Sequence, residues 1–135
     1  MSQPELRRLT VPRLTKYVPH YPEPPQAAFL LLDCREAFYG GAAGGGKSDA
    51  LLMAALQYVD CPAYSALILR RTFPELSLPG AIMDRAHDWL RPSDARWLET
   101  EKTWRFPSGA TLSFGYLQHE NDKYTGAKVT RITNC

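Results

Sequence analysis

One short glycine-rich segment constrains the fold of this chain more than any other feature. Residues 41–48 read Gly-Ala-Ala-Gly-Gly-Gly-Lys-Ser, which matches the pattern G-x-x-x-x-G-K-[ST] at every fixed position. The segment follows one apolar run and opens another, as expected where a strand leads through a phosphate-binding loop into a helix. A glycine-rich turn that happens to contain Lys-Ser is the alternative, but the flanking apolar runs favour the loop.

The residue types in this segment suit a bound polyphosphate. The glycines that the pattern contributes are Gly41, Gly44, Gly45 and Gly46. Residues without side chains let backbone N–H groups approach an anion closely and adopt positive φ angles. The ammonium group of Lys47 is expected to reach the β- and γ-phosphates, and the hydroxyl of Ser48 is expected to coordinate Mg²⁺. The sequence therefore predicts a site for ATP and Mg²⁺ centred on Lys47 and Ser48.

Alternating apolar segments on both sides of the loop predict an α/β fold. The expected elements are a short helix or turn over 26–33, a buried strand over 36–39, a buried helix over 47–59, a buried strand over 66–69, a helix after Pro79, and strand-like runs over 103–106 and 110–116. The last two runs flank Pro-Ser-Gly and therefore predict a hairpin. Residues 27–135 are thus expected to form a partial P-loop ATPase domain, with an incomplete doubly wound sheet of the ASCE type and an added antiparallel β-hairpin.

The first 26 residues differ in composition from the rest of the chain. They hold six of the eleven prolines, and proline fixes φ and removes a backbone donor. Residues 1–26 are therefore expected to form a proline-rich, extended arm that lies on the domain. Its basic residues, Arg7, Arg8, Arg13 and Lys16, either contact a phosphate backbone or remain solvated.

Charge, cysteine content and hydropathy exclude several classes of protein. The net charge of +2 is too small to indicate a nucleic-acid surface by itself. The three cysteines form no CxxC pair, so reduced thiols are expected. The longest apolar run, residues 27–32, is far too short to cross a bilayer, which predicts a soluble intracellular protein.

Two groups of side chains receive structural interpretations. Trp89, Trp97 and Trp104 are expected to pack in the core or in the hairpin. Charges at Asp84, Arg85, Asp88 and Arg91 fall opposite the apolar positions of their helix, so a solvated face is expected.

A second acidic position, which ATP hydrolysis requires, is not evident. In P-loop enzymes a carboxylate at the end of an apolar strand holds Mg²⁺ and orients the attacking water. Residues 29–33 end in Asp33, but too few residues separate them from the strand before the loop for a parallel crossover. The run over 112–116 reaches Glu120 and Asp122 only through a polar stretch. The chain is therefore expected to stop short of its catalytic acid.

Residues 16–126 resemble the start of the ATPase domain of a tailed-bacteriophage terminase large subunit, the motor that packages DNA. The similar segments are, in order, 16–20 with Gln26, 38–52, 68–76, 106–110, 114–116 and 122–124. Many nucleotidases share the loop, but Arg-Arg-Thr at 70–72 followed by Phe-Pro-Ser-Gly at 106–109 is more specific.

The resemblance implies roles for three further residues. Gln26 would contact adenine through its amide, and the alternative is an ordinary surface glutamine. Arg70 and Arg71 would join Lys47 as catalytic residues by sensing or stabilising phosphate charge, as arginine fingers do. A structural ion pair is the alternative for both arginines, and the sequence does not distinguish between them.

Two functions follow from the resemblance. The first is an N-terminal fragment of a packaging ATPase that binds ATP and turns over little of it alone. Full-length members of that family form a ring on the portal, interact with a small terminase subunit and move double-stranded DNA, in the cytoplasm of a bacterial host and without a membrane. The second is a non-catalytic nucleotide-binding remnant of a disrupted prophage gene.

Overall fold

The computed structural model describes residues 11–34, 36–40, 46–117 and, as backbone, 128–132. This part contains four helices and five strands. The helices are α2 (Pro24–Leu30), α3 (Lys47–Leu56), α4 (Phe73–Ser77) and α5 (Ile82–Leu90). The strands are β1 (Ser65–Arg70), β2 (Arg96–Leu98), β3 (Thr103–Arg105), β4 (Thr111–Tyr116) and β5 (Lys128–Ile132).

The strands form one mixed sheet in the order β2-β3-β4-β1-β5. Strands β1 and β4 are parallel, with Ser65 opposite Thr111 and Arg70 opposite Tyr116. The other three pairs are antiparallel. The α/β class and the hairpin formed by β3 and β4 are therefore confirmed.

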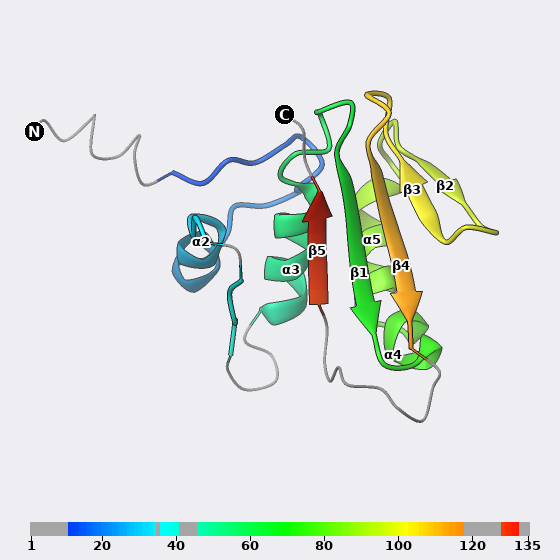
Figure 1. Ribbon diagram of the computed structural model, residues 1–135, viewed down its shortest axis with the longest axis horizontal. Coiled ribbons are helices and arrows are strands. Elements are labelled where there is room, and N and C mark those ends of the chain that lie inside the picture. The colour runs from blue at the N-terminus through cyan, green and yellow to red at the C-terminus, as the bar shows by residue number, and fades with distance from the viewer. Residues whose placement is uncertain (1–10, 35, 41–45, 118–127, 133–135) are drawn as a thin grey trace, which may run out of the picture.

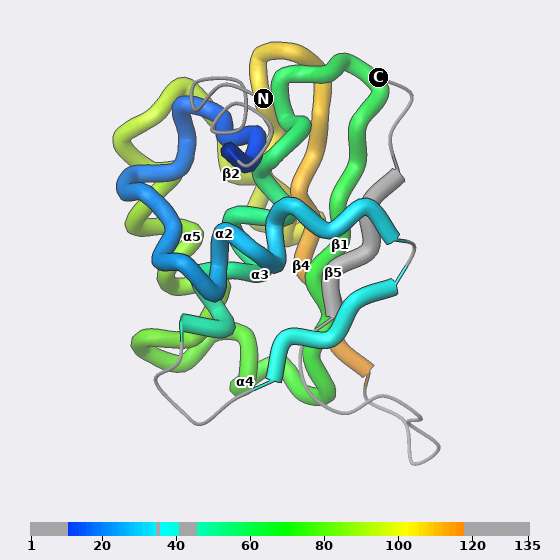
Figure 2. Tube along the Cα trace, turned by 90° about the vertical axis from the view of Figure 1, so that its left-hand side faces the viewer, coloured from blue at the N-terminus to red at the C-terminus, as the bar shows by residue number. Residues whose placement is uncertain are grey.

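Helices α3 and α5 cover the same face of the sheet (Figures 1 and 2). Side chains that alternate along the central strands, Ala66 and Ile68 in β1 and Leu112 and Phe114 in β4, are buried on that face. Side chains between them are only half-buried. The expectation of a doubly wound sheet is thus not met in the described part, where these two large helices lie on one side.

The expected strand over 36–39 is absent, and this prediction is wrong. These residues are extended, but they pair with no described strand, and the Phe38 side chain is 92% exposed. Both edges of β1 are already used, one by β4 and the other by β5. A segment of apolar residues becomes a strand only where its backbone pairs with a neighbouring strand, and residues 36–39 do not pair with β1 or with any other described strand.

Helix α3 lies at the centre of the fold and is apolar on nearly every side, as its sequence predicts. Six of its ten residues are buried, among them Leu52, Met53 and Leu56. The helix ends at Leu56, three residues before the predicted end. Two hydrogen bonds fasten the region to the sheet: the Tyr64 hydroxyl donates to the Ala55 carbonyl at 2.7 Å, and the Ser108 hydroxyl donates to the Val59 carbonyl at 2.6 Å.

The described part of the N-terminal arm is fastened to the domain. Arg13 forms an ion pair with Asp60 at 2.8 Å, and Lys16 forms one with Asp94 at 2.8 Å. The buried Tyr17 donates its hydroxyl to the same Asp94 at 2.7 Å, and these bonds hold the pKa of Asp94 below its usual range. Arg13 and Lys16 therefore form ion pairs within the chain while their side chains stay 41% and 69% exposed, and contact with a phosphate backbone stays a prediction.

Disulfide bonding differs from the expectation of reduced thiols. Cys61 is disulfide-bonded, whereas Cys34 is free and exposed, and Cys135 lies outside the described residues.

Among the described residues, no helix combines the length and the apolar character that crossing a membrane requires.

Two of the tryptophans, Trp97 and Trp104, pack in the hairpin region beside the half-buried His87, and Trp89 packs against His20. Trp104 is 3% exposed, and the His87 ring lies 5.1 Å from it and 4.5 Å from the half-buried Trp97, centroid to centroid. Burial lowers the pKa of His87 below its ordinary 6.5, and the nearby Arg91 charge adds to this effect. The folded protein therefore favours the neutral imidazole.

This histidine should make stability depend on pH. Below pH 6.5 the unfolded state binds a proton that the folded state resists, so the free energy of unfolding should decrease as the pH falls from about 7.5 to about 5.5. Urea unfolding at a series of pH values measures the effect. A His87→Phe variant keeps a ring between the tryptophans and should show a smaller decrease over the same range. Equal pH dependence in both proteins would contradict the assignment.

Candidate functional site

The start of helix α3 holds the described half of the phosphate-binding motif. Gly46 is the N-cap in the left-handed conformation, with φ at 77°, and Lys47 and Ser48 form the first turn. No side chain caps this end of the helix. The first backbone N–H groups of a helix lack intrahelical acceptors and favour negative charge, so this end fits a phosphate group. Gly41, Gly44 and Gly45 lie outside the described residues.

The backbone conformation of Gly46 favours glycine, and its surroundings are close. Its positive φ is unfavourable for other residues. In addition, a Cβ atom at this position would lie 2.5 Å from Nε2 of Gln26, which is closer than real contacts allow. The Gln26 side chain of α2 therefore lies directly against Gly46, and a larger residue at position 46 would have to displace the end of that amide.

Gln26 is buried, at 4% exposure, and is not a surface glutamine. Its Oε1 atom accepts a hydrogen bond from the Glu23 backbone at 2.8 Å, within the capping box of α2. Its Nε2 atom donates to the Gly46 carbonyl at 3.0 Å. In this arrangement the amide joins α2 to the start of α3, and contact with adenine stays a prediction.

Asp49, in the first turn of α3, is paired with a charge from α5. Arg85 donates to its carboxylate through Nε and, at 2.8 Å, through Nη2, while Nε2 of His20 lies 3.4 Å from the same group. The bond to Asp49 raises the pKa of Arg85. The expectation of a solvated charged face is therefore wrong for Arg85. Because Asp49 is offset by a cation, the helix start keeps its positive character.

The two candidate arginines lie at the edge of the sheet where α3 begins. Strands β1 and β4 both end at the end of the sheet where α3 begins (Figure 1). Ligands of α/β proteins bind at this carboxyl edge of parallel strands. Arg70 is half-buried, and its buried Nε atom has no hydrogen-bond partner among the described residues, whereas Arg71 is exposed. The structure thus distinguishes two arginines that the sequence does not.

The donor set for a cation is limited in the described part of the chain. Ser48 lies in the first turn of α3, so its hydroxyl is placed next to the helix start, as a magnesium ligand beside a triphosphate would be. In the same part, no group of three or more His, Cys, Asp or Glu residues is arranged to hold a metal ion. The described residues would therefore supply one ligand to Mg²⁺, the Ser48 hydroxyl, and phosphate oxygens and water molecules would supply the others.

Comparison with known proteins gave no match, whether with protein-family models, curated proteins or solved structures.

Two features of the site were missed by sequence reasoning. The Asp49–Arg85 pair joins residues 36 positions apart, and the Gln26–Gly46 bond joins residues 20 positions apart. The spacing of residues within each helix could not predict the Asp49–Arg85 pair, because the two residues lie in different helices. The Pro-Pro-Gln start of α2 could have indicated a capping box at Gln26, but not its partner at Gly46.

Replacing Gln26 with alanine should destabilise the fold. The change removes the hydrogen bond that Gln26 donates to the Gly46 carbonyl and the one it accepts from the Glu23 N–H, and at about 0.5–1.5 kcal/mol for each bond the expected loss is about 1–3 kcal/mol. Urea unfolding of Gln26→Ala should show a loss in that range, whereas Glu36→Ala, at an exposed position, should unfold like the parent. A Gln26→Ala protein as stable as the parent would show that the bridge contributes nothing.

Proposed function

We propose that this chain binds Mg–ATP through residues 41–48 and is the N-terminal part of a viral DNA-packaging motor ATPase, a terminase large subunit. The match of residues 41–48 to the phosphate-binding pattern at every fixed position carries the proposal, and its last two residues begin helix α3. The uncapped start of α3 supports phosphate binding. The match of Arg70, Arg71 and the hairpin turn to the terminase pattern supports the family.

Each described residue of the site has a distinct task in this proposal. The ammonium group of Lys47 offsets the charge of the β- and γ-phosphates, and the N–H groups of the first turn of α3 add hydrogen bonds. The Ser48 hydroxyl ligates Mg²⁺. Arg70 supplies a second cation from the end of β1. In the family, double-stranded DNA, the small subunit and the portal are the partners, and the bacterial cytoplasm is the location.

A nucleotide-binding remnant without catalysis is the second candidate. It is favoured because none of the described strands ends on a carboxylate residue. Strand β1 ends on Arg70, β4 on Tyr116 and β5 on Ile132. Without an acidic strand end, water activation lacks its base or orienting group. ATP turnover clearly above that of a Lys47→Ala protein would favour the motor fragment over the remnant.

Removal of the Lys47 ammonium group should weaken Mg–ATP binding by about tenfold or more, since a charge-assisted hydrogen bond contributes roughly 1.5–3 kcal/mol. Isothermal titration calorimetry compares Lys47→Ala with the parent. Lys16→Ala, which removes the same charge from the N-terminal arm, is the control and should bind like the parent. Unchanged affinity in Lys47→Ala would overturn the proposal.

The two arginines should differ in their effect on affinity. Arg70→Gln should weaken Mg–ATP binding by about tenfold, because a half-buried guanidinium with an unpaired Nε atom is placed to donate to phosphate. The neighbouring exposed residue provides the matched variant, and Arg71→Gln should change affinity little. The same titrations measure both, and a larger loss for Arg71 would reverse the assignment.

A further inference from the structure

The third residue of helix α3 carries a negative charge at the end of the helix where the phosphates would bind. Lys47, Ser48 and Asp49 form the first turn of α3, and Asp49 is the acidic residue of that turn. Its carboxylate is attracted by the same positive helix end that would attract a phosphate group. An unpaired Asp49 would therefore weaken the binding of an anion at this place.

The Asp49 carboxylate is bonded to an arginine of another helix. Arg85, in α5, donates to one carboxylate oxygen through Nε and to the other, at 2.8 Å, through Nη2. The Asp49 side chain is 16% exposed. A two-point bond of this kind fixes the direction of the carboxylate. Both oxygens of Asp49 are thus bonded to α5, and the guanidinium charge offsets that of the carboxylate.

Three further groups surround this ion pair. Nε2 of His20, from the N-terminal arm, lies 3.4 Å from Asp49. Asp84 and Asp88, in the same helix as Arg85, contribute negative charge near its guanidinium. These groups are unchanged in any variant of Asp49 or Arg85, so a difference between such variants reports on the pair itself.

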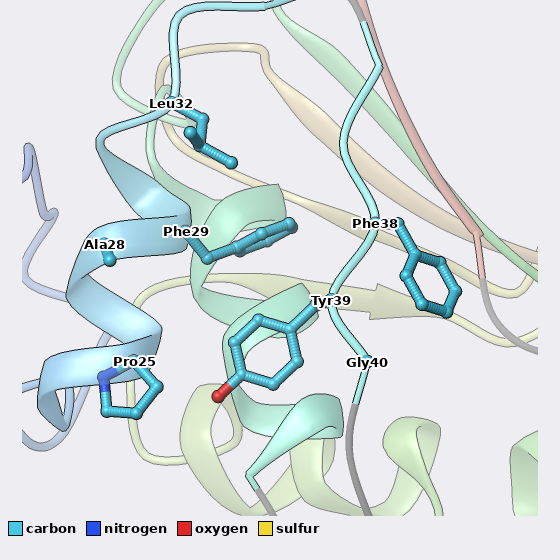
Figure 3. Close-up of a pocket in the computed structure, with 7 residues that line it drawn as sticks. All are labelled: Pro25, Ala28, Phe29, Leu32, Phe38, Tyr39 and Gly40. Atoms are coloured by element: carbon cyan, nitrogen blue, oxygen red, sulfur yellow. The ribbon is translucent and has the colours of Figure 1, made fainter.

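The apolar pocket between α2 and residues 36–40 contributes no charge to these surroundings. The Phe29 and Tyr39 rings point toward each other there and meet edge to face at 5.3 Å (Figure 3). None of the seven residues that line the pocket is Asp, Glu, His, Lys or Arg. The pocket therefore neither adds to the charge of Asp49 nor cancels it.

We propose that Arg85 is a positioning residue for phosphate binding, which acts by cancelling the charge of Asp49 and so raises the affinity of the helix start for the anion. The inference rests on the proposed function and deepens it, because it adds to the site a residue of α5, 36 positions from Asp49 in the sequence. Arg85 touches Asp49 and needs no contact with the nucleotide.

A purely structural pair, which only fastens α3 to α5, makes the opposite prediction for one of the partners. If the pair only joins the helices, loss of either Asp49 or Arg85 loosens the first turn of α3 and weakens binding. If the charge of Asp49 matters, loss of the arginine weakens phosphate binding and loss of the carboxylate strengthens it. The sign of the change in the Asp49 variant therefore decides between the two interpretations.

Calorimetric titrations with Mg–ATP and with Mg–tripolyphosphate test the inference. Arg85→Gln leaves an uncompensated charge in the first turn and should weaken the binding of both by about threefold to tenfold. Asp49→Asn keeps the size of the side chain and one acceptor oxygen, and should strengthen binding by about threefold. Arg85→Lys, which keeps the charge, and the double variant Asp49→Asn/Arg85→Gln, which removes both charges, should each bind within about twofold of the parent.

The Arg13–Asp60 pair provides a matched control. The Arg13 side chain is 41% exposed and that of Arg85 is 40% exposed, and each is bonded to an aspartate. Arg13 donates to the Gln57 carbonyl, at the opposite end of the ten-residue helix α3 and therefore about 15 Å from its start. Charges act over about 8–10 Å at physiological salt, so Arg13→Gln should leave affinity unchanged.

The outcomes separate this inference from the proposed function. Weaker or unchanged binding by Asp49→Asn, or an equal loss in Arg13→Gln and Arg85→Gln, would overturn the inference while binding of Mg–tripolyphosphate by the parent upholds the motif. Urea unfolding of each variant measures stability separately, and if Arg85→Gln does not fold, the sign of the change in Asp49→Asn still decides. A parent protein that does not bind Mg–tripolyphosphate would instead overturn the proposed function, and this inference with it.

Discussion

Burial of the apolar sides of α3 is the interaction on which the rest of the structure depends. The helix contacts α2, α5 and the sheet, and its interior residues, such as Leu52 and Met53, are fully buried. Such burial contributes about 1.5–3 kcal/mol for each large side chain. Because α3 is held along its length, its first turn, with Lys47 and Ser48, is fixed at the end of the sheet where β1 and β4 end. Packing of the core thereby determines where the cationic end of the helix points.

Predictions from sequence succeeded where local pattern and tertiary structure agree. The apolar run over 66–69, the helical spacing of Ile82, Ala86 and Leu90, and the Pro-Ser-Gly turn each contain enough local signal for the observed element. Predictions failed where pairing between strands that are far apart in the sequence determines whether a segment is a strand. Residues 128–132 alternate polar and apolar side chains weakly, and they become a strand by pairing with β1, whereas residues 36–39 find no described partner. The motif was identified from sequence, but the pocket and the Gln26 bridge required the fold.

Several charged side chains in the described part are paired within the chain. Arg13 and Lys16, the described basic residues of the arm, bind Asp60 and Asp94. Arg85 is paired with Asp49 in the first turn of α3. Arg70 differs, because its Nε atom is buried without a partner among the described residues. A buried N–H group without an acceptor lowers the stability of the folded state. An anion that accepts a hydrogen bond from Arg70 Nε would remove this cost.

The parallel pairing of β1 with β4 also has a consequence for how the chain reaches its folded state. Ser65 and Thr111 are 46 residues apart, whereas Thr103 and Ser113, which face each other in the β3–β4 hairpin, are 10 apart. The entropy lost on closing a loop rises with the number of residues in it, so the hairpin can form locally. The parallel pair can form only after the intervening chain, which includes α4 and α5, has brought β4 back to β1. Strand β1, buried and unable to pair locally, is then the segment most exposed to association with other chains during synthesis.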